Sequence, residues 1–402
     1  VIIEQAETFN GKTNDDYSNP LNSYLPRGTI DYCDPNPVVV ESRTREGKKV
    51  TLKYHLWRFG KRTYLSNDSS GTNIKVYKAK LPETNTVTAA GGVAKDARHT
   101  TLTFDVLWKA PFQLVPEGKS WYSEPNATEP KFAISGSFGS KYVDITFCYA
   151  AAGQGVLEFG SDNPVFTRAE WFRNERDYTL RLYLKKAGGL YGWSANYNAS
   201  GQLVFKFLHP ARINAAAAKP LAGTKIVVDP GHGGSDPGAV FAKNLPTEDD
   251  LNLTISKKLE NKLTAKGAQV LMTRTDDRLV YMRDRAALTR EFTPDLFISV
   301  HMNAGGGSVR GYENYYFSPF SKRLANAVYN KMKGVPNFAS YMRGDKFGKY
   351  FVTRISDCPS ILTENGFVTN KDEYTWVNSG NGADQIAQAT ADGILDYFKS
   401  IQ

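Results

Sequence analysis

The sequence is poor in cysteine and contains no long apolar run. Cys33, Cys148 and Cys358 are its three cysteines and lie far apart, which excludes a dense disulfide framework and a cysteine-rich zinc knuckle. No stretch approaches the roughly 18 apolar residues of a membrane-spanning helix, so no transmembrane segment is expected. The first residues also lack the basic and apolar regions of an export signal, so cellular location has to be inferred from function.

Basic residues are in excess but form no dense block. The formal net charge of +9 favours acidic partners, such as a wall polymer, nucleic acid or an anionic membrane. The nearest approach to a cluster is a short pair such as Lys48-Lys49 or Lys61-Arg62, and no DNA- or RNA-recognition signature is present. We therefore expect no nucleic-acid partner.

The 402 residues exceed what one hydrophobic core usually serves, and the first half reads as β-rich. Short runs alternate apolar and polar residues, as in TLTFDV at 101–106 and YVDITF at 142–147, with turn residues between them. This pattern predicts an all-β sandwich over residues 91–208. Residues 1–90 are expected to form a smaller β-rich unit, with strands at 49–57 and 73–81.

The pattern changes after a stretch that we expect to be a linker, HPARINAAAAKPLAG at 209–223. Near-continuous apolar strands then alternate with amphipathic helices, which predicts an α/β domain over 224–402 with a mostly parallel sheet covered on both faces. Its strands are expected near 225–229, 269–274, 295–301, 312–317, 349–355 and 360–364. Its helices are expected from Thr247 to Gly267, from Ser318 to Gly334 and from 383 to 399.

Three of these strands deliver a metal-ligand type of side chain where they end. His232 follows the first strand, His301 closes the third and Glu364 closes the last. Loops gather at this edge of an α/β sheet, so the three side chains are expected to meet there. Glu248 opens a predicted helix, where the helix dipole favours an ionised carboxylate. Two imidazoles and a carboxylate are a frequent catalytic zinc set with a glutamate as acid/base partner, but these residues alone do not decide which glutamate is the ligand.

Each signal also has a structural alternative. The segment DPGHGG at 229–234 is compatible with a simple turn, and its glycines with a phosphate-binding loop, although the G-x-x-x-x-G-K-[ST] pattern is missing. His301 fits a core histidine, Glu248 a helix cap and Glu364 a solvated strand end. A cysteine hydrolase using Cys358 is disfavoured, because that thiol lies at a strand entrance rather than an exit.

Residues 225–402 resemble the zinc-dependent N-acetylmuramoyl-L-alanine amidases, the Amidase_3 family of cell-wall hydrolases. The matching segments, in chain order, are IVVDPGHGGSDPGA, EDDLNL, VLMTRTDD, MRDRAAL, DLFISVHMNA, GYENYYF, PSILTENGF and IAQATADGILDYF. The resemblance implies a mixed six-stranded sheet flanked by helices. It also implies a peptidoglycan hydrolase that cleaves the amide between the lactyl group of N-acetylmuramic acid and L-alanine by means of zinc-activated water.

The same resemblance assigns roles to the candidate site residues. His232, Glu248 and His301 match the ligands of Zn2+, and Glu364 matches the catalytic carboxylate. The approach to Glu248, NLPTEDD, departs from the family pattern, so Asp249 and Asp250 stay open as alternative ligands. Asp229 is either a residue that orients His232 or a turn former. The segment from 303 to 364 is short, so we expect no inserted helix that plugs the site.

The β-rich half resembles the AMIN-type envelope-targeting modules only in strand pattern and placement, and we expect it to bind an envelope partner. Action on the wall implies a periplasmic or extracellular location at the cell envelope. Two other functions stay open, namely another zinc peptidase that acts on wall peptides and a non-catalytic wall-binding protein with an amidase fold.

Overall fold

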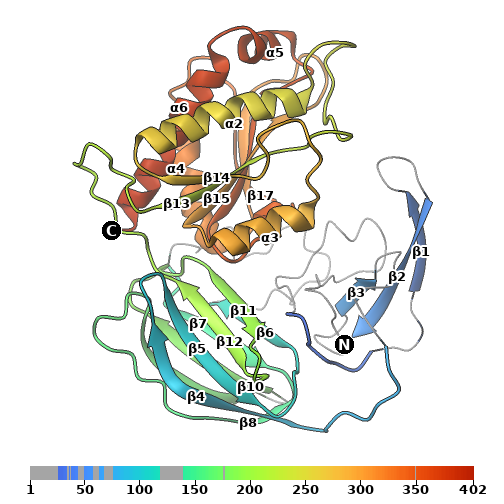
Figure 1. Cartoon of the computed structure of the whole chain (residues 1–402), viewed down its shortest axis with the longest axis vertical. Helices are drawn as coiled ribbons and strands as arrows, with labels where there is room; N and C mark the ends of the chain where they lie inside the picture. Colours follow the sequence, from blue (N-terminus) through green and yellow to red (C-terminus); the bar gives the residue numbers. More distant parts are fainter. Residues whose placement is uncertain are drawn as a thin grey trace. The chain divides into compact units, whose positions relative to one another are not determined.

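The computed structural model divides the chain into two compact units, residues 1–209 and 210–402 (Figure 1). It describes residues 26–33, 36, 38–43, 49–57, 63–67, 76–117, 139–174, 177–348 and 350–402. The boundary between the units falls at His209 and Pro210, where the expected linker begins. Residues 209–223 form neither helix nor strand.

The described part of the first unit is built from three β-sheets. The smallest contains β1 (Val38–Arg43), β2 (Lys49–Trp57) and β3 (Thr63–Asn67). A four-stranded sheet has the order β6 (Phe112–Pro116), β7 (Tyr142–Phe147), β10 (Asp177–Leu184), β9 (Phe166–Asn174). A five-stranded sheet has the order β11 (Trp193–Tyr197), β12 (Leu203–Leu208), β5 (His99–Val106), β4 (Asn85–Lys95), β8 (Ala150–Gln154).

The two larger sheets pack face to face through aromatic side chains. The ring of Phe104 on β5 lies 5.3 Å from that of Phe147 on β7 and 6.1 Å from that of Trp171 on β9, measured between centroids. Phe104 and Phe147 are both buried, as alternation in their strands predicts. The predicted sandwich is therefore confirmed.

Most strand predictions for this unit hold, with one exception. The strands predicted at 49–57, 101–106 and 142–147 are present. The strand predicted at 73–81 is wrong over its described part, because residues 76–81 belong to no strand. Val76 and Tyr77 are 45% and 61% exposed, so their alternation with lysine does not mark a buried face.

The second unit contains a six-stranded mixed sheet. Its order is β14 (Gln269–Met272), β13 (Lys225–Pro230), β15 (Leu296–Asn303), β18 (Ser360–Phe367), β16 (Tyr312–Tyr316), β17 (Met342–Phe347). Neighbouring strands are parallel except β16 and β18, which are antiparallel. The predicted fold class, a mixed and mostly parallel sheet flanked by helices, is confirmed.

Helices cover this sheet on both faces (Figure 1). α6 (Gly382–Ser400) contacts both α2 (Glu248–Ala265) and α4 (Lys322–Met332). α3 (Met282–Phe292) instead contacts β13 and the short 3-10 helix η3 (Val352–Arg354). The connections β13–α2–β14 and β14–α3–β15 run in opposite directions along the sheet, so right-handed crossovers place α2 and α3 on opposite faces.

The start of α2 follows from a capping box. The backbone N–H of Thr247 donates to Oδ2 of Asp250 at 3.1 Å, and the helix then buries a stripe of Leu251, Ile255 and Leu259. Gly267 follows its end with a φ of +94°, which favours glycine. Among the described helices, none combines the length and apolar character needed to cross a membrane.

The strand predicted at 349–355 is wrong over its described part, because residues 350–355 belong to no strand. The edge strand is β17, which lies earlier in the chain, and residues 352–354 form η3. Val352 and Ile355 are both buried, and residues three apart lie on the same side of a 3-10 turn but on opposite faces of a strand. β17 escaped prediction because its sequence, MRGDKF, carries charges and a glycine. α3 and α5 (Lys371–Asn378) were not predicted either.

The contact between α4 and α6 depends on Gly393. A Cβ at this position would lie 2.6 Å from Cα of Val328. We therefore expect Gly393→Ala to destabilise the second unit by roughly 1–3 kcal/mol through overpacking, even though alanine has the higher helix propensity. Urea unfolding measures the change, and Gln388→Ala, at an exposed position of the same helix, is the control. A Gly393→Ala protein as stable as the parent would contradict this close packing.

Candidate metal centre

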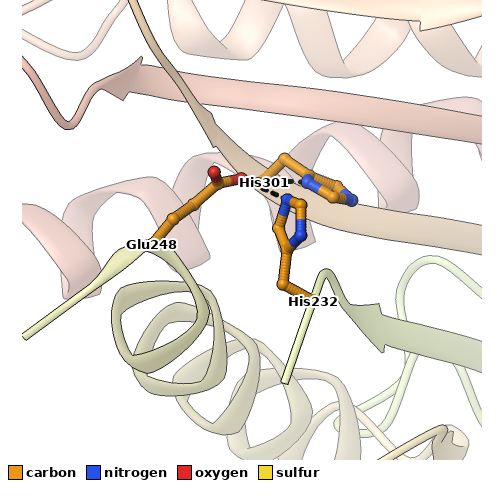
Figure 2. Close-up of side chains that lie close together, drawn as sticks. All are labelled: His232, Glu248 and His301. Carbon is orange, nitrogen blue, oxygen red and sulfur yellow. Dashed lines mark hydrogen bonds and ion pairs between the residues drawn. The ribbon is translucent and has the colours of Figure 1, made fainter. Parts of the chain in front are cut away.

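His232, Glu248 and His301 meet at the carboxyl end of the sheet (Figure 2). Nδ1 of His301 lies 3.0 Å from Oε1 of Glu248, and Nε2 of His232 lies 3.1 Å from the same oxygen. One ligand atom from each of the three residues falls within 4.8 Å of the others. Residues separated by up to 69 positions in the sequence are thus brought to one point by β13, α2 and β15.

The donor set and spacing fit a divalent ion. Two ligands bound tetrahedrally to zinc at 2.0–2.1 Å lie about 3.3 Å apart, close to the nitrogen–oxygen distances found here. Burial by itself raises the pKa of the Glu248 carboxyl, but hydrogen bonds from His232 and His301 outweigh it and hold that pKa well below its usual range. Glu248 is therefore ionised, as a carboxylate ligand must be.

Asp236, which sequence reasoning missed, orients the first imidazole. Its Oδ2 lies 2.9 Å from Nδ1 of His232, which leaves Nε2 of the ring facing Glu248. A carboxylate on the distal nitrogen of a ligand histidine fixes the tautomer and the ring orientation. The sequence signal was available, because Asp236 follows His232 by four residues within the same glycine-rich loop.

Asp229, expected either to orient His232 or to form a turn, contacts other groups than the His232 ring among the described residues. The carboxylate of Asp229 is buried and accepts hydrogen bonds from Thr273 Oγ1 at 2.5 Å, Arg285 Nη1 at 2.5 Å and Ser299 Oγ at 2.6 Å. It therefore acts on the loop through Arg285, whose Nη2 donates to the backbone oxygen of His232 at 2.8 Å.

Two buried arginines hold the loop that carries His232. His232 has a φ of +60°, a left-handed conformation that a non-glycine residue adopts only when its surroundings impose it. Arg274 donates from Nη2 to the backbone oxygens of Gly231 and Asp249, each at 2.8 Å, and Arg285 holds the oxygen of His232. These arginines lie in the segments VLMTRTDD and MRDRAAL, so the resemblance contained them without revealing their role.

Glycine is required at two positions because ligand side chains pass directly over the backbone. A Cβ on Gly231 would lie 2.1 Å from Cε1 of His301. A Cβ on Gly238, whose φ is +65°, would lie 2.5 Å from Oε2 of Glu248 and 2.8 Å from Cδ2 of His232. The glycine-rich sequence therefore makes space for the metal ligands.

The two alternative ligands are engaged in capping α2. Asp250 accepts from the backbone of Thr247, and Asp249 accepts from the Thr247 hydroxyl. Neither belongs to the group formed by the two histidines and Glu248. Glu248 is further fixed by the backbone N–H of Ala239, which donates to its Oε2 at 2.8 Å.

Glu364 lies beside this group on the central strand β18. It pairs with His301 on β15 in parallel register and with Glu313 on β16 in antiparallel register. Its Oε2 is buried and has no hydrogen-bond partner in the described part of the chain. Burial raises the pKa of the Glu364 carboxyl well above its usual value, and the nearby carboxylates of Glu248 and Glu313 raise it further. Glu364 is thus a carboxyl with one oxygen available for proton exchange.

The sheet, the strand-end ligands and the neighbouring glutamate define an α/β domain with the donor set of metal-dependent hydrolases. Residues 226–396 match the family model described as N-acetylmuramoyl-L-alanine amidase. The chain belongs to this family, and the resemblance seen in the sequence is confirmed.

Relatives match over a little less than half of the chain. An uncharacterized protein, YqiI, of Bacillus subtilis (strain 168) is 35% identical over 188 residues, which cover 46% of this chain and 89% of the relative. The N-acetylmuramoyl-L-alanine amidase LytC of the same organism is 34% identical over 45% of this chain and 36% of the relative. The crystal structure of an N-acetylmuramoyl-L-alanine amidase from Clostridium difficile 630 matches with 35% identity and a TM-score of 0.43, covering 45% of this chain and all of that chain.

The contact between Asp236 and His232 generates a prediction about metal affinity. Asp236→Ala should weaken zinc binding by roughly 10- to 100-fold, because the imidazole loses the group that fixes its orientation. Competition with a chromogenic chelator measures the affinity. Asp284→Ala is the control, since it removes an exposed carboxylate from α3 and should leave zinc affinity intact. Equal affinities for the two variants would contradict the role given to Asp236.

Proposed function

We propose that residues 224–402 form a zinc-dependent amidase that cleaves the bond between the lactyl group of N-acetylmuramic acid and L-alanine in peptidoglycan. The observation that carries the proposal is the placement of Glu364, with its unpartnered carboxylate oxygen, beside two imidazoles and an ionised carboxylate. Membership of the amidase family supports the choice of bond and substrate. His232, Glu248 and His301 are the proposed ligands, and Glu364 is the proposed acid/base.

The chemistry divides between the metal and one side chain. Bound Zn2+ supplies a Lewis acid that polarises the lactyl carbonyl and acidifies water. Oε2 of Glu364 takes a proton from the attacking water and later gives a proton to the departing nitrogen of L-alanine. The raised pKa of Glu364 suits a group that must hold the proton between these two steps. The products are a free lactyl carboxylic acid and a stem peptide with an intact amino terminus.

The remaining residues of the site keep the ligands in place. Asp236 sets the tautomer of His232, and Arg285 holds the backbone of the same residue. The His301 ring packs directly against the backbone at Gly231, which leaves no room for a side chain beneath that ligand. Ligands that are fixed in this way cost little reorganisation when a reaction proceeds.

The first half of the chain has a separate proposed role. We propose that the sandwich of residues 91–208 follows a smaller unit at 1–90, precedes a linker at 209–223 and binds a partner in the cell envelope. The whole protein would then act outside the cytoplasmic membrane, in the periplasm or at the cell surface. Relatives whose names include cell wall amidase, such as LytH of Staphylococcus aureus, support this placement.

Substitution of Glu364 separates catalysis from metal binding. Glu364→Ala should retain one zinc per chain and lose about 100- to 10,000-fold in rate, the usual contribution of a general acid/base. Release of stem peptide from purified peptidoglycan and metal analysis of the same sample provide the two readouts. Glu291→Gln, at an exposed position of α3, is the control. Full activity in Glu364→Ala would refute the proposed role.

Substitution of His232 tests the metal centre, and the digest identifies the bond. His232→Ala should lose zinc, because only two ligands remain, and should lose activity with it. Mass spectrometry of the parent digest should find stem peptides that begin with free L-alanine. Cuts inside the stem peptide would instead indicate another zinc peptidase. A His232→Ala protein that still holds one zinc per chain would exclude this residue as a ligand.

A further inference from the structure

The row of side chains that contains His301 and Glu364 continues across the sheet. Glu364 on β18 is paired with Glu313 on β16, and Glu313 is paired with Gly344 on β17. Directly paired residues project to the same face of a sheet, so the carboxyl groups of Glu364 and Glu313 share a face with the His301 ring. Neighbouring strands are about 4.8 Å apart, which places Glu313 roughly 10 Å from the strand of His301.

Glu313 is a buried carboxylate that accepts hydrogen bonds from two cationic side chains. Its side chain is 4% exposed, and its Oε2 accepts from Nε of Arg343 at 3.0 Å and from Nζ of Lys346 at 2.5 Å. Its Oε1 accepts from the hydroxyl of Tyr315 at 2.7 Å and from Nδ2 of Asn303 at 2.8 Å. Burial raises the pKa of Glu313, but the hydrogen bonds from Lys346, Tyr315 and Arg343 outweigh it and lower that pKa, so the group is ionised.

Arg343 and Lys346 each have hydrogen-bond donors that Glu313 does not use. Each of their side chains is 38% exposed. Arg343 bonds to Glu313 through Nε, and in the described ranges no acceptor lies on its Nη1 or Nη2. Lys346 uses one of its three protons. Two cations thus share the single carboxylate of Glu313, and both remain partly exposed at the edge of the sheet, although Arg343 also interacts electrostatically with Glu373.

A purely structural role accounts poorly for this arrangement. Replacing a buried ion pair by well-packed apolar residues of similar volume is often neutral or stabilising, so the joining of β16 to β17 does not by itself require this charged cluster. Glu313 also adds negative charge next to Glu364, since it contributes to raising the pKa of Glu364. The cluster instead fixes a guanidinium and an ammonium group beside the proposed catalytic carboxyl, in an orientation suited to binding an anion.

We propose that Arg343 and Lys346 form a subsite for a carboxylate of the stem peptide, carried by the second or third residue after the scissile amide. The inference rests on the proposed amidase function and adds a preference among stem peptides. An extended peptide advances about 3.3–3.6 Å per residue, so two or three residues span the roughly 10 Å from His301 to the strand of Glu313. The free edge of the Arg343 guanidinium matches a carboxylate in a bidentate geometry.

Matched substrates that differ in one carboxylate test the subsite. The first pair is N-acetylmuramoyl-L-alanyl-D-isoglutamyl-L-lysine and its D-isoglutaminyl counterpart. The second pair carries diaminopimelate or its monoamide as the third residue. The parent protein should cleave the carboxylate member of at least one pair with a kcat/KM about 10- to 100-fold above that of the amide, the usual value of charge-assisted hydrogen bonds. The responding pair identifies the recognised residue.

Two variants connect the preference to the cluster. In Arg343→Gln and Lys346→Gln, the ratio of the two kcat/KM values should fall toward 1. Lys346→Arg keeps the charge and should keep most of the preference, which separates the charge from effects on folding. Lys257→Gln, which removes the same charge at an exposed position of α2, should leave the ratio unchanged.

The outcomes distinguish this inference from the function on which it rests. If the parent cleaves both members of both pairs equally, the subsite is refuted while the amidase function stands. If the parent prefers the carboxylate and the two variants retain that preference, the carboxylate binds elsewhere and the subsite is again refuted. If the parent releases no stem peptide from any of the four compounds or from intact peptidoglycan, the proposed function itself fails and the subsite fails with it.

Discussion

Burial of the ionised Glu248 between two imidazoles is the interaction on which the catalytic half depends. The same oxygen faces both rings, at 3.0 and 3.1 Å, and the side chain is almost completely shielded from water. A charge buried in this way is tolerated only when its partners are held in good geometry. Much of the surrounding structure serves this requirement. The first turn of α2 presents the carboxylate, the loop after β13 bends to bring His232 toward it, and β15 ends where His301 reaches the same point.

The loop after β13 shows that residues far from Glu248 in the sequence help to hold its partners in good geometry. His232 adopts a left-handed backbone conformation, and neither the short strand before it nor the glycines after it could impose that conformation alone. Arg274 and Arg285, on segments that follow α2 in the chain, reach back to its carbonyl groups and to Asp229. Asp229 neutralises Arg285 through a direct ion pair, whereas Arg274 is held by backbone carbonyl groups, and together they fix the loop. A second charged cluster, around Glu313, lies on the other side of Glu364 in the same row.

The sequence revealed the parts of the site that depend on local pattern. Strand exits and a helix start predicted where His232, His301, Glu364 and Glu248 lie, because parallel strands end at one edge of a sheet. The choice between the two glutamates needed the family resemblance. Asp236, Arg274 and Arg285 were not assigned roles, because their contacts join segments whose relative positions no periodicity encodes. β17 was placed wrongly for a related reason, since a short edge strand that carries charges lacks the alternation on which strand prediction relies.

The crowding of Gly231 and Gly238 against the ligands limits how this domain can be stabilised. Replacing loop glycines is a common route to greater thermal resistance, because it reduces the freedom of the unfolded chain. At these two positions that route is closed, since the space a methyl group would fill is already occupied by His301 and by Glu248. Engineering for robustness must therefore turn to surfaces remote from the reaction, such as the solvent-facing sides of α2 and α6.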